Sequence, residues 1–298
     1  MTENTIIEIK ELKLERENSP LLENVNLCIE RGQIIFLLGP NGCGKSSLLS
    51  LFRKVKSAKA KDKNKNKKSG HDPLYEGEFN VICDNESVNF IKANNKENDN
   101  NIFYYSNIAY LDQNDYIENM ANIKRTMKQS AHNALIALCN ANKIDKATVR
   151  SRCEDLEAEA DKCIAMLNSR KVKNFEKKRT KHLSGGQKRF VSFCRTYFMA
   201  KYVGSKILVL DEPLNHLDCE YKMAIDGMLR DLIAEREKAG DPITLIIVSH
   251  CLPFSFIKSN PKCLQFEFEK NGLVPVPENE KYQYNCLNRK NSKTENSN

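Results

Sequence analysis

Short apolar runs, separated by longer amphipathic stretches, divide most of this chain into predicted strands and helices. Residues 5–35 read as strands and turns, because Val25, Leu27 and Ile29 alternate with polar residues and Arg31-Gly32 makes a turn. Three later runs, "QIIFLL", "KILVLDEP" and "TLIIVSH", are almost continuously apolar and too short for helices. Such runs are typical of strands that are buried on both faces, as in a parallel sheet.

Helical periodicity begins near residue 118 and continues to about residue 179. One stripe steps by fours and threes through Val149, Cys153, Leu156, Ala160, Cys163 and Leu167. Asp145 is a plausible N-cap for that helix. Two further helices are expected, one ending near Ala200 and one over residues 219–239, with inward side chains at Tyr221, Ile225, Met228, Leu232 and Ile233 and a stop at Gly240.

The order of these elements predicts the fold class. Strands that alternate with helices favour an α/β domain with a mostly parallel central sheet. An antiparallel β region comes first, a helical block is inserted between Gln113 and Leu183, and an alternating hairpin surrounds Asn271-Gly272. Two polar stretches, Lys54–Ser69 and Lys92–Asn101, are expected to be surface loops, and the last ten or so residues to be disordered.

Composition narrows the class of protein. The 298 residues are 40% hydrophobic, which is enough for a real core, and contain no apolar run of about 18 residues, so no transmembrane helix is expected. The polar, acidic N-terminus does not resemble a signal peptide. We therefore expect a cytoplasmic protein, with peripheral attachment to the cytoplasmic face of a membrane as an alternative. The eleven scattered cysteines are expected to be reduced thiols.

The net charge of +8 is concentrated in one segment. Nine basic residues and one acid lie in Arg53–Lys68, and the rest of the chain carries 38 basic and 38 acidic residues. The body is therefore neutral, which does not suit a basic nucleic-acid-binding domain. The lysine-rich run, about residues 53–69, is expected to be a solvated insertion, and binding to RNA or to acidic lipid headgroups is the alternative.

A phosphate-binding loop follows the first buried strand. "GPNGCGKS" fits the pattern G-x-x-x-x-G-K-[ST] and lies between a predicted strand and a predicted helix. Its glycines let backbone amides surround phosphate oxygens, Lys45 would neutralise the outer phosphates, and the Ser46 hydroxyl would hold Mg²⁺. The expected nucleotide-binding residues are Gly39, Pro40, Asn41, Gly42, Cys43, Gly44, Lys45, Ser46 and Ser47.

A pair of carboxylates supplies the second half of a nucleotide hydrolase. The strand "KILVL" ends at Asp211 and Glu212. At the same sheet edge as the phosphate loop, Asp211 suits Mg²⁺ coordination and Glu212 suits a base that polarises the attacking water.

Together with four further motifs, these sequences resemble the ATP-binding cassette (ABC) ATPases over roughly residues 5–275. Gln113 after "IAYLD" matches the family's glutamine loop, Asp218 in "LNHLD" its aspartate loop, and His250 after "LIIVS" its switch histidine. The family signature LSGGQ is spelled by Leu183, Ser184, Gly185, Gly186 and Gln187. All six motifs occur in the family's order, which makes the resemblance highly specific.

The resemblance implies a P-loop NTPase fold and ATP hydrolysis with Mg²⁺, at the interface between two cassettes packed head to tail. Each signature would cover the nucleotide held by the other cassette, with Ser184 and the amides of Gly185 and Gly186 approaching its γ-phosphate. Gln113 would contact Mg²⁺ or the water, and His250 the γ-phosphate. Asp218 would lie in the dimer interface. A second cassette, identical or different, is therefore an expected partner.

Several residues beside the motifs carry weaker expectations. The family stacks adenine on an early aromatic residue, whereas this chain has none before Phe36, and Arg16 lies at about that place. A guanidinium can stack on a base, so both ATP and GTP stay open as substrates. His182 and His216 are expected to be bystanders, and Lys188 and Arg189 solvated charges on a helix.

The resemblance leaves two functions open. One is the ATPase subunit of a transporter whose transmembrane subunits are separate chains. The other is a cassette protein that acts on ribosomes or another macromolecular complex, because "EPLNHLD" is close to a spelling common in the translation-factor branch. The expected organisation is one cassette over residues 1–275, with a helical subdomain at about 114–182, followed by a polar tail over 276–298.

Overall fold

The computed structural model describes residues 4–52, 73–84, 86–91, 99–115, 117, 120–168, 179–249, 254, 260–269 and 272–277. The strands are β1 (Thr5–Arg16), β2 (Ser19–Glu30), β3 (Ile34–Leu38), β4 (Leu74–Cys83), β5 (Glu86–Asn89), β6 (Ile108–Leu111), β7 (Ile207–Asp211), β8 (Thr244–Val248), β9 (Cys263–Glu269) and β10 (Gly272–Pro275). The helices are α1 (Lys45–Leu49), α2 (Asp99–Asn107), α3 (Ile123–Asn140), α4 (Lys146–Asn168), α5 (Gly185–Phe198) and α6 (Cys219–Lys238).

Two sheets organise the molecule. A four-stranded antiparallel sheet has the order β2-β1-β4-β5, and a six-stranded sheet has the order β10-β9-β3-β8-β7-β6. Within the larger sheet every neighbouring pair is parallel except the β9–β10 hairpin. The expected α/β class, with a mostly parallel central sheet and an N-terminal antiparallel region, is confirmed.

The apolar runs are buried on both faces, as their composition predicts. In β3, Ile34 and Phe36 belong to one hydrophobic core, and Ile35 and Leu37 belong to the other. The strands β7 and β8 alternate in the same way. The first core lies under the helices, and the second lies between the larger sheet and the antiparallel sheet, so each strand of the centre is sandwiched between layers.

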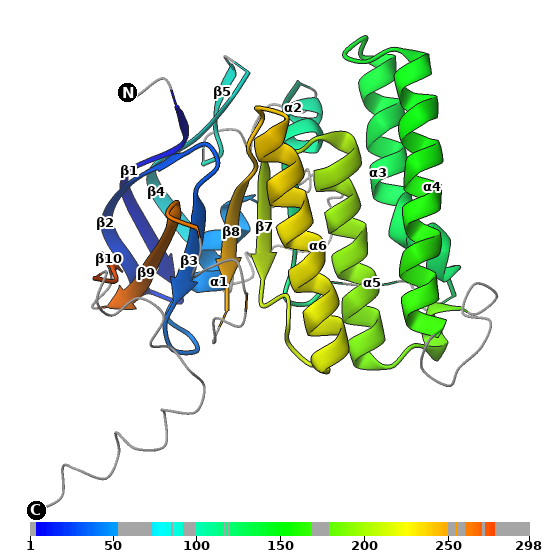
Figure 1. Cartoon of the computed structure of the whole chain (residues 1–298). Coiled ribbons are helices and arrows are strands. Elements are labelled where there is room, and N and C mark those ends of the chain that lie inside the picture. Colours follow the sequence, from blue (N-terminus) through cyan, green and yellow to red (C-terminus); the bar gives the residue numbers. More distant parts are fainter. Residues whose placement is uncertain are drawn as a thin grey trace, which may run out of the picture.

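The helices α3, α4, α5 and α6 form a block on one side of the central strands (Figure 1). The helices α5 and α6 run along β7 and β8, and α3 and α4 stand beyond them, at the far end of the molecule from β1 and β2. Asp145 accepts a hydrogen bond from the Thr148 amide, which confirms it as the N-cap of α4. The hydrogen bonds that the Asp145 carboxylate accepts from the backbone and side chain of Thr148 lower the pKa of Asp145.

One expectation about secondary structure was wrong at its end. Lys92–Asn101 was expected to be a loop, but α2 begins at Asp99 and continues to Asn107, and residues 92–98 lie outside the described residues. The asparagine-rich composition hides this helix, because Asn has low helix propensity and favours turns. Phe103, which is buried against the second core, supplies the tertiary packing that overrides the local preference. The lysine-rich run and the C-terminal tail from residue 278 lie outside the described residues.

Candidate nucleotide-binding and catalytic site

The motif residues lie where the parallel strands end. The phosphate loop follows β3, Gln113 follows β6, and Asp211 and Glu212 end β7, so all of them meet at the carboxyl edge of the sheet. A cavity of about 550 Å³ opens at this edge. Its lining comprises Arg16, Glu17, Ser19, Leu21, Asn41, Gly42, Gly44, Lys45, Ser46, Ser47, Gln113, Glu212 and Val248.

The glycines of the phosphate loop are needed for its backbone path. Gly39, Gly42 and Gly44 have φ values of 139°, 83° and 107°, a region that L-residues with a side chain rarely adopt. A Cβ on Gly44 would also lie 3.2 Å from the Leu21 Cβ. The loop is therefore fixed by three glycines, two of which line the cavity, in the bare-backbone arrangement that suits phosphate.

Lys45 is held against its own loop. Its ammonium group donates to the carbonyl of Gly39 at 2.9 Å and to that of Pro40 at 2.7 Å, and the side chain is buried. These carbonyls keep a buried charge solvated by protein oxygens. A phosphate entering the cavity would offer the ammonium group a full negative charge in exchange for two neutral acceptors.

The two carboxylates at the end of β7 are buried, with 1% of Asp211 and 4% of Glu212 exposed. Glu212 adopts a φ of 50°, which is unusual for a residue with a side chain, and its amide donates to the Val248 carbonyl of β8 at 2.9 Å. This backbone conformation turns Glu212 onto the cavity lining, whereas Asp211 lies outside that lining.

The donors near the cavity suit Mg²⁺. Ser46 offers a hydroxyl, Gln113 an amide oxygen and Asp211 a carboxylate, so the whole set consists of oxygen ligands. Mg²⁺ prefers such hard ligands and commonly takes one or two carboxylates together with the phosphates of its substrate. The residues present therefore fit the metal that the sequence implied.

Arg189 corrects an expectation. It was expected to be a solvated charge on α5, but its half-buried guanidinium donates to the backbone carbonyls of Asp112, Gln113, Asp211 and Glu212. The guanidinium gives these backbone carbonyls charge-assisted hydrogen bonds, and the Glu212 carbonyl also accepts from the Asn215 amide at 3.2 Å. Burial lowers the pKa of Arg189, and the nearby acidic groups oppose that shift. No local pattern in the sequence marks this residue.

The signature forms the first turn of α5. Ser184 is its N-cap, and a capping box joins Ser184 and Gln187: the Gln187 amide donates to the Ser184 hydroxyl oxygen at 3.2 Å, and the Ser184 amide donates to Gln187 Oε1 at 2.9 Å. Leu183 is buried. None of the five signature residues lines the cavity, so the structure does not bring the signature to the chain's own phosphate loop.

The two signature glycines have different surroundings. A Cβ on Gly185 would meet no atom within 4 Å. A Cβ on Gly186 would lie 2.8 Å from the carbonyl oxygen of His216, which is closer than real Cβ atoms approach. The lack of a side chain at Gly186 therefore allows α5 to pack closely against the aspartate loop. His216 takes part in this contact through its backbone carbonyl.

The structure describes some of the remaining expected site residues but not all of them. Asp218 is the N-cap of α6 and accepts from the Tyr221 amide at 3.3 Å, so its side chain has a local role. Its dimer role stays a prediction. His250 lies outside the described residues. Arg16 lines the cavity, where its guanidinium could reach a base. The neighbouring Glu17 also lines the cavity and was not expected from the sequence, although the turn at Asn18 shows that the chain reverses there.

Cys43 gives a testable prediction within the phosphate loop. Its half-buried Sγ lies 3.7 Å from the Lys45 ammonium nitrogen. A maleimide adduct would overfill the loop, so we expect alkylation to weaken ATP binding by about 10-fold or more. Prior addition of ATP should protect the thiol. The matched control is Cys43→Ala, which removes this thiol and leaves the exposed Cys28 and Cys219. Normal ATP binding by protein alkylated at Cys43 would contradict the prediction.

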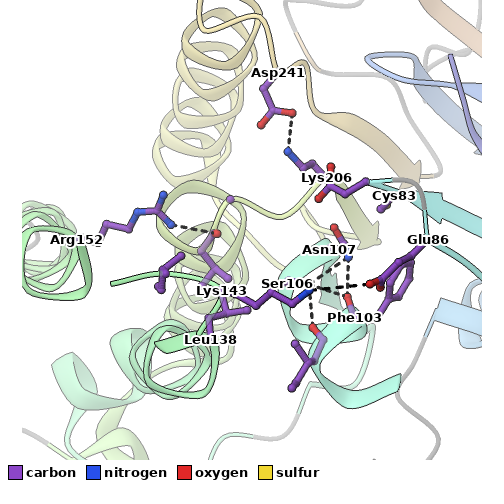
Figure 2. A pocket seen from close by; sticks show the side chains of 15 residues that line it. Cys83, Glu86, Phe103, Ser106, Asn107, Leu138, Lys143, Arg152, Lys206 and Asp241 are labelled. Carbon is purple, nitrogen blue, oxygen red and sulfur yellow. Dashed lines mark hydrogen bonds and ion pairs between the residues drawn. The ribbon is translucent and has the colours of Figure 1, made fainter. Parts of the chain in front are cut away.

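Figure 2 shows a second cavity, of about 520 Å³, at the opposite edge of the sheet. Asn107, Lys206 and Asp241 precede β6, β7 and β8, so this cavity lies at the amino ends of the strands. Two of its cationic side chains have local partners: Lys206 pairs with Asp241 at 2.8 Å, and Arg152 donates to the Val203 carbonyl at 3.4 Å. No motif residue lines it, and we assign the nucleotide to the first cavity.

Two further findings concern the described residues as a whole. The nine cysteines among them are free thiols. Within the same ranges, no helix has the length and apolar character needed to cross a bilayer.

The comparisons with known proteins agree with the geometry. The family model described as ABC transporter matches residues 22–215. The chain is 26% identical over 250 residues to the spermidine/putrescine import ATP-binding protein PotA of Clostridium acetobutylicum, a match that covers 84% of this chain and 55% of the relative. It is 28% identical over 248 residues to ABC transporter F family member 2 of Arabidopsis thaliana, covering 83% and 26%. The chain thus spans about half of the one relative and a quarter of the other.

Solved structures support the fold. A dimeric post-hydrolysis structure of the ATP-binding cassette MJ0796 with ADP and Pi is similar, with a TM-score of 0.59 at 18% identity, over 91% of this chain and 98% of that one. The cbiO1 structure from Clostridium perfringens has a TM-score of 0.53 at 20% identity, over 91% and 88% of the two chains. The family model matches more than half of the chain, and the chain therefore belongs to the ABC transporter family as an ATP-binding cassette, an ABC-type ATPase.

Proposed function

We propose that this chain is the ATPase subunit of an ABC transporter and hydrolyses ATP at the interface of two cassettes packed head to tail. One observation carries the proposal: the cavity holds the phosphate loop and Glu212, whereas the signature lies outside it with Gly185 open. A site divided in this way is completed by a second cassette, and two-fold symmetry would complete two sites at one interface.

Within the proposed site each residue has a separate task. The phosphate-loop amides and Lys45 hold the phosphates, and Arg16 stacks on the base. Mg²⁺ held by Ser46, Gln113 and Asp211 would neutralise charge on the phosphate oxygens.

The chemical step depends on three further residues. Glu212 accepts a proton from the attacking water, and its burial removes competing solvent. Gln113 orients that water, and His250 contacts the γ-phosphate. Ser184 and Gly185 of the second cassette complete the contacts to the same phosphate.

The transporter assignment is supported by the relatives. PotA is named as an import ATP-binding protein, and the matched family is described as ABC transporter. The transmembrane subunits of the proposed transporter are separate chains. The cassette itself is proposed to occupy residues 1–275 at the cytoplasmic face of the membrane, with residues 114–182 as its helical subdomain.

The alternative is a cassette that acts on ribosomes or another macromolecular complex. One observation favours it: the motif "EPLNHLD" is close to a spelling common in the translation-factor branch of the family. The basic run Arg53–Lys68 would then be a candidate contact to RNA.

Cell fractionation of a Glu212→Gln variant tests both functions. This change should permit ATP-driven closure and prevent hydrolysis, so partners stay bound. Lysates would be separated on a density gradient with and without mild detergent, and with and without nuclease. Sedimentation with membranes, released by detergent as a larger complex, supports the transporter subunit. Migration with ribosomes that nuclease abolishes overturns that assignment and supports the alternative.

A further inference from the structure

One guanidinium joins the two segments that carry the proposed hydrolytic residues. Arg189 lies on α5, and its Nη1 donates to the carbonyl of Asp112 and, at 3.4 Å, to that of Gln113. Its Nη2 donates to the carbonyl of Asp211 and, at 3.0 Å, to that of Glu212. One end of the fork therefore contacts the chain that leaves β6, and the other end contacts the chain that leaves β7.

We propose that Arg189 is a positioning residue for ATP hydrolysis, which fixes the backbone of Gln113 relative to that of Glu212 so that both side chains face the same cavity. The proposal rests on the proposed roles of these two residues. Both line the nucleotide cavity, whereas Arg189 does not, so it acts through them.

The chemistry of the side chain suits this task. A guanidinium is planar, and its donors lie in a rigid fork that can hold two pairs of acceptors at a fixed separation. The ammonium group of lysine is a compact charge on a flexible side chain. It could donate to the carbonyls of one segment but could not reach those of the other segment at the same time. Four carbonyl acceptors on two segments therefore require arginine.

The surroundings of Arg189 also favour a fixed geometry. Its Nε is buried, and the carboxylates of Asp115, Asp211 and Glu212 are close enough to favour the charged form electrostatically. Charge-assisted hydrogen bonds to carbonyls are stronger than neutral ones.

The position on α5 has a consequence for the signature. Arg189 is five residues after Ser184, in the helix whose first turn carries the signature. The same helix makes a second contact with the segment after β6, because Arg195 forms an ion pair with Asp115. A movement of α5 as the signature engages the other cassette's nucleotide is therefore transmitted directly to the backbone at Gln113 and Glu212.

The test compares Arg189→Lys and Arg189→Ala with Lys188→Ala in the full chain. Lys188 is the half-buried neighbour on the same helix, and its side chain makes no hydrogen bond or ion pair within the ranges that the structure describes. For each variant, phosphate release gives kcat and KM, fluorescent TNP-ATP gives nucleotide affinity, and thermal unfolding reports the fold. Glu212→Gln is included as the reference for lost hydrolysis.

We expect both Arg189 variants to lower kcat by about 10-fold or more with less than about 3-fold change in KM and TNP-ATP affinity, because misplacement of reacting groups costs rate more than binding. If Arg189→Ala fails to fold, the Arg189→Lys variant still tests the proposal. An unchanged kcat in a folded Arg189→Lys variant overturns the proposal, as does a parallel loss of kcat and affinity. If Glu212→Gln itself stays active, the proposed assignment of the base fails, and that result is distinct from a failure at Arg189.

Discussion

Replacing Glu212 by Gln is expected to lower the ATP turnover number by about 10²- to 10⁴-fold, the range typical for loss of a general base. Glutamine has nearly the same shape but cannot take the proton of the attacking water. Because the phosphate loop and Lys45 are unchanged, ATP affinity should stay within about 3-fold. The variant should also accumulate as an ATP-bound dimer, since the cassettes close but cannot proceed.

Phosphate release under steady-state conditions and size-exclusion chromatography with Mg-ATP measure these two effects. The matched control is Glu237→Gln, which makes the same chemical change at an exposed position on α6 whose carboxylate pairs only loosely with Lys262, at 3.5 Å. This control should retain full turnover, because exposed ion pairs contribute little. Turnover by Glu212→Gln close to that of the unchanged chain would mean that another group activates the water.

Alanine at the two signature glycines is expected to give opposite kinds of defect. Gly185→Ala should fold normally, because its Cβ meets nothing within 4 Å and alanine favours the first turn of α5. Its methyl group would face the nucleotide of the second cassette, so turnover should fall by about 10- to 100-fold. Gly186→Ala should destabilise the chain by about 1–3 kcal/mol, because its Cβ would lie 2.8 Å from the His216 carbonyl oxygen.

Thermal or urea unfolding separates the stability effect from the ATPase assay. Each variant is the control for the other, since both add one methyl group to adjacent positions of the same helix. Any net stability loss for Gly186→Ala would show that the steric cost exceeds the roughly 1 kcal/mol gained by replacing a helical glycine. Equal stability of the two variants would contradict the close approach, and full turnover by Gly185→Ala would contradict the head-to-tail site.

Much of this protein could be predicted from the sequence, because the signals are local. The central strands β7 and β8 are runs of five buried residues, as in "ILVLD". A run this short and this apolar indicates a strand buried on both faces rather than a helix. The glycines of the phosphate loop and the capping pair Ser184 and Gln187 act within a few residues of each other. Such patterns identify the strands, the phosphate loop and the family without any knowledge of packing.

The tertiary structure alone decided features that depend on distant segments. Arg189 looks like a surface charge, and only the meeting of β6, β7 and α5 places four backbone carbonyl groups around it. The sequence determined that two glycines stand side by side in the signature. The fold decided that Gly185 faces open space and Gly186 faces the His216 carbonyl, because that contact joins residues thirty positions apart.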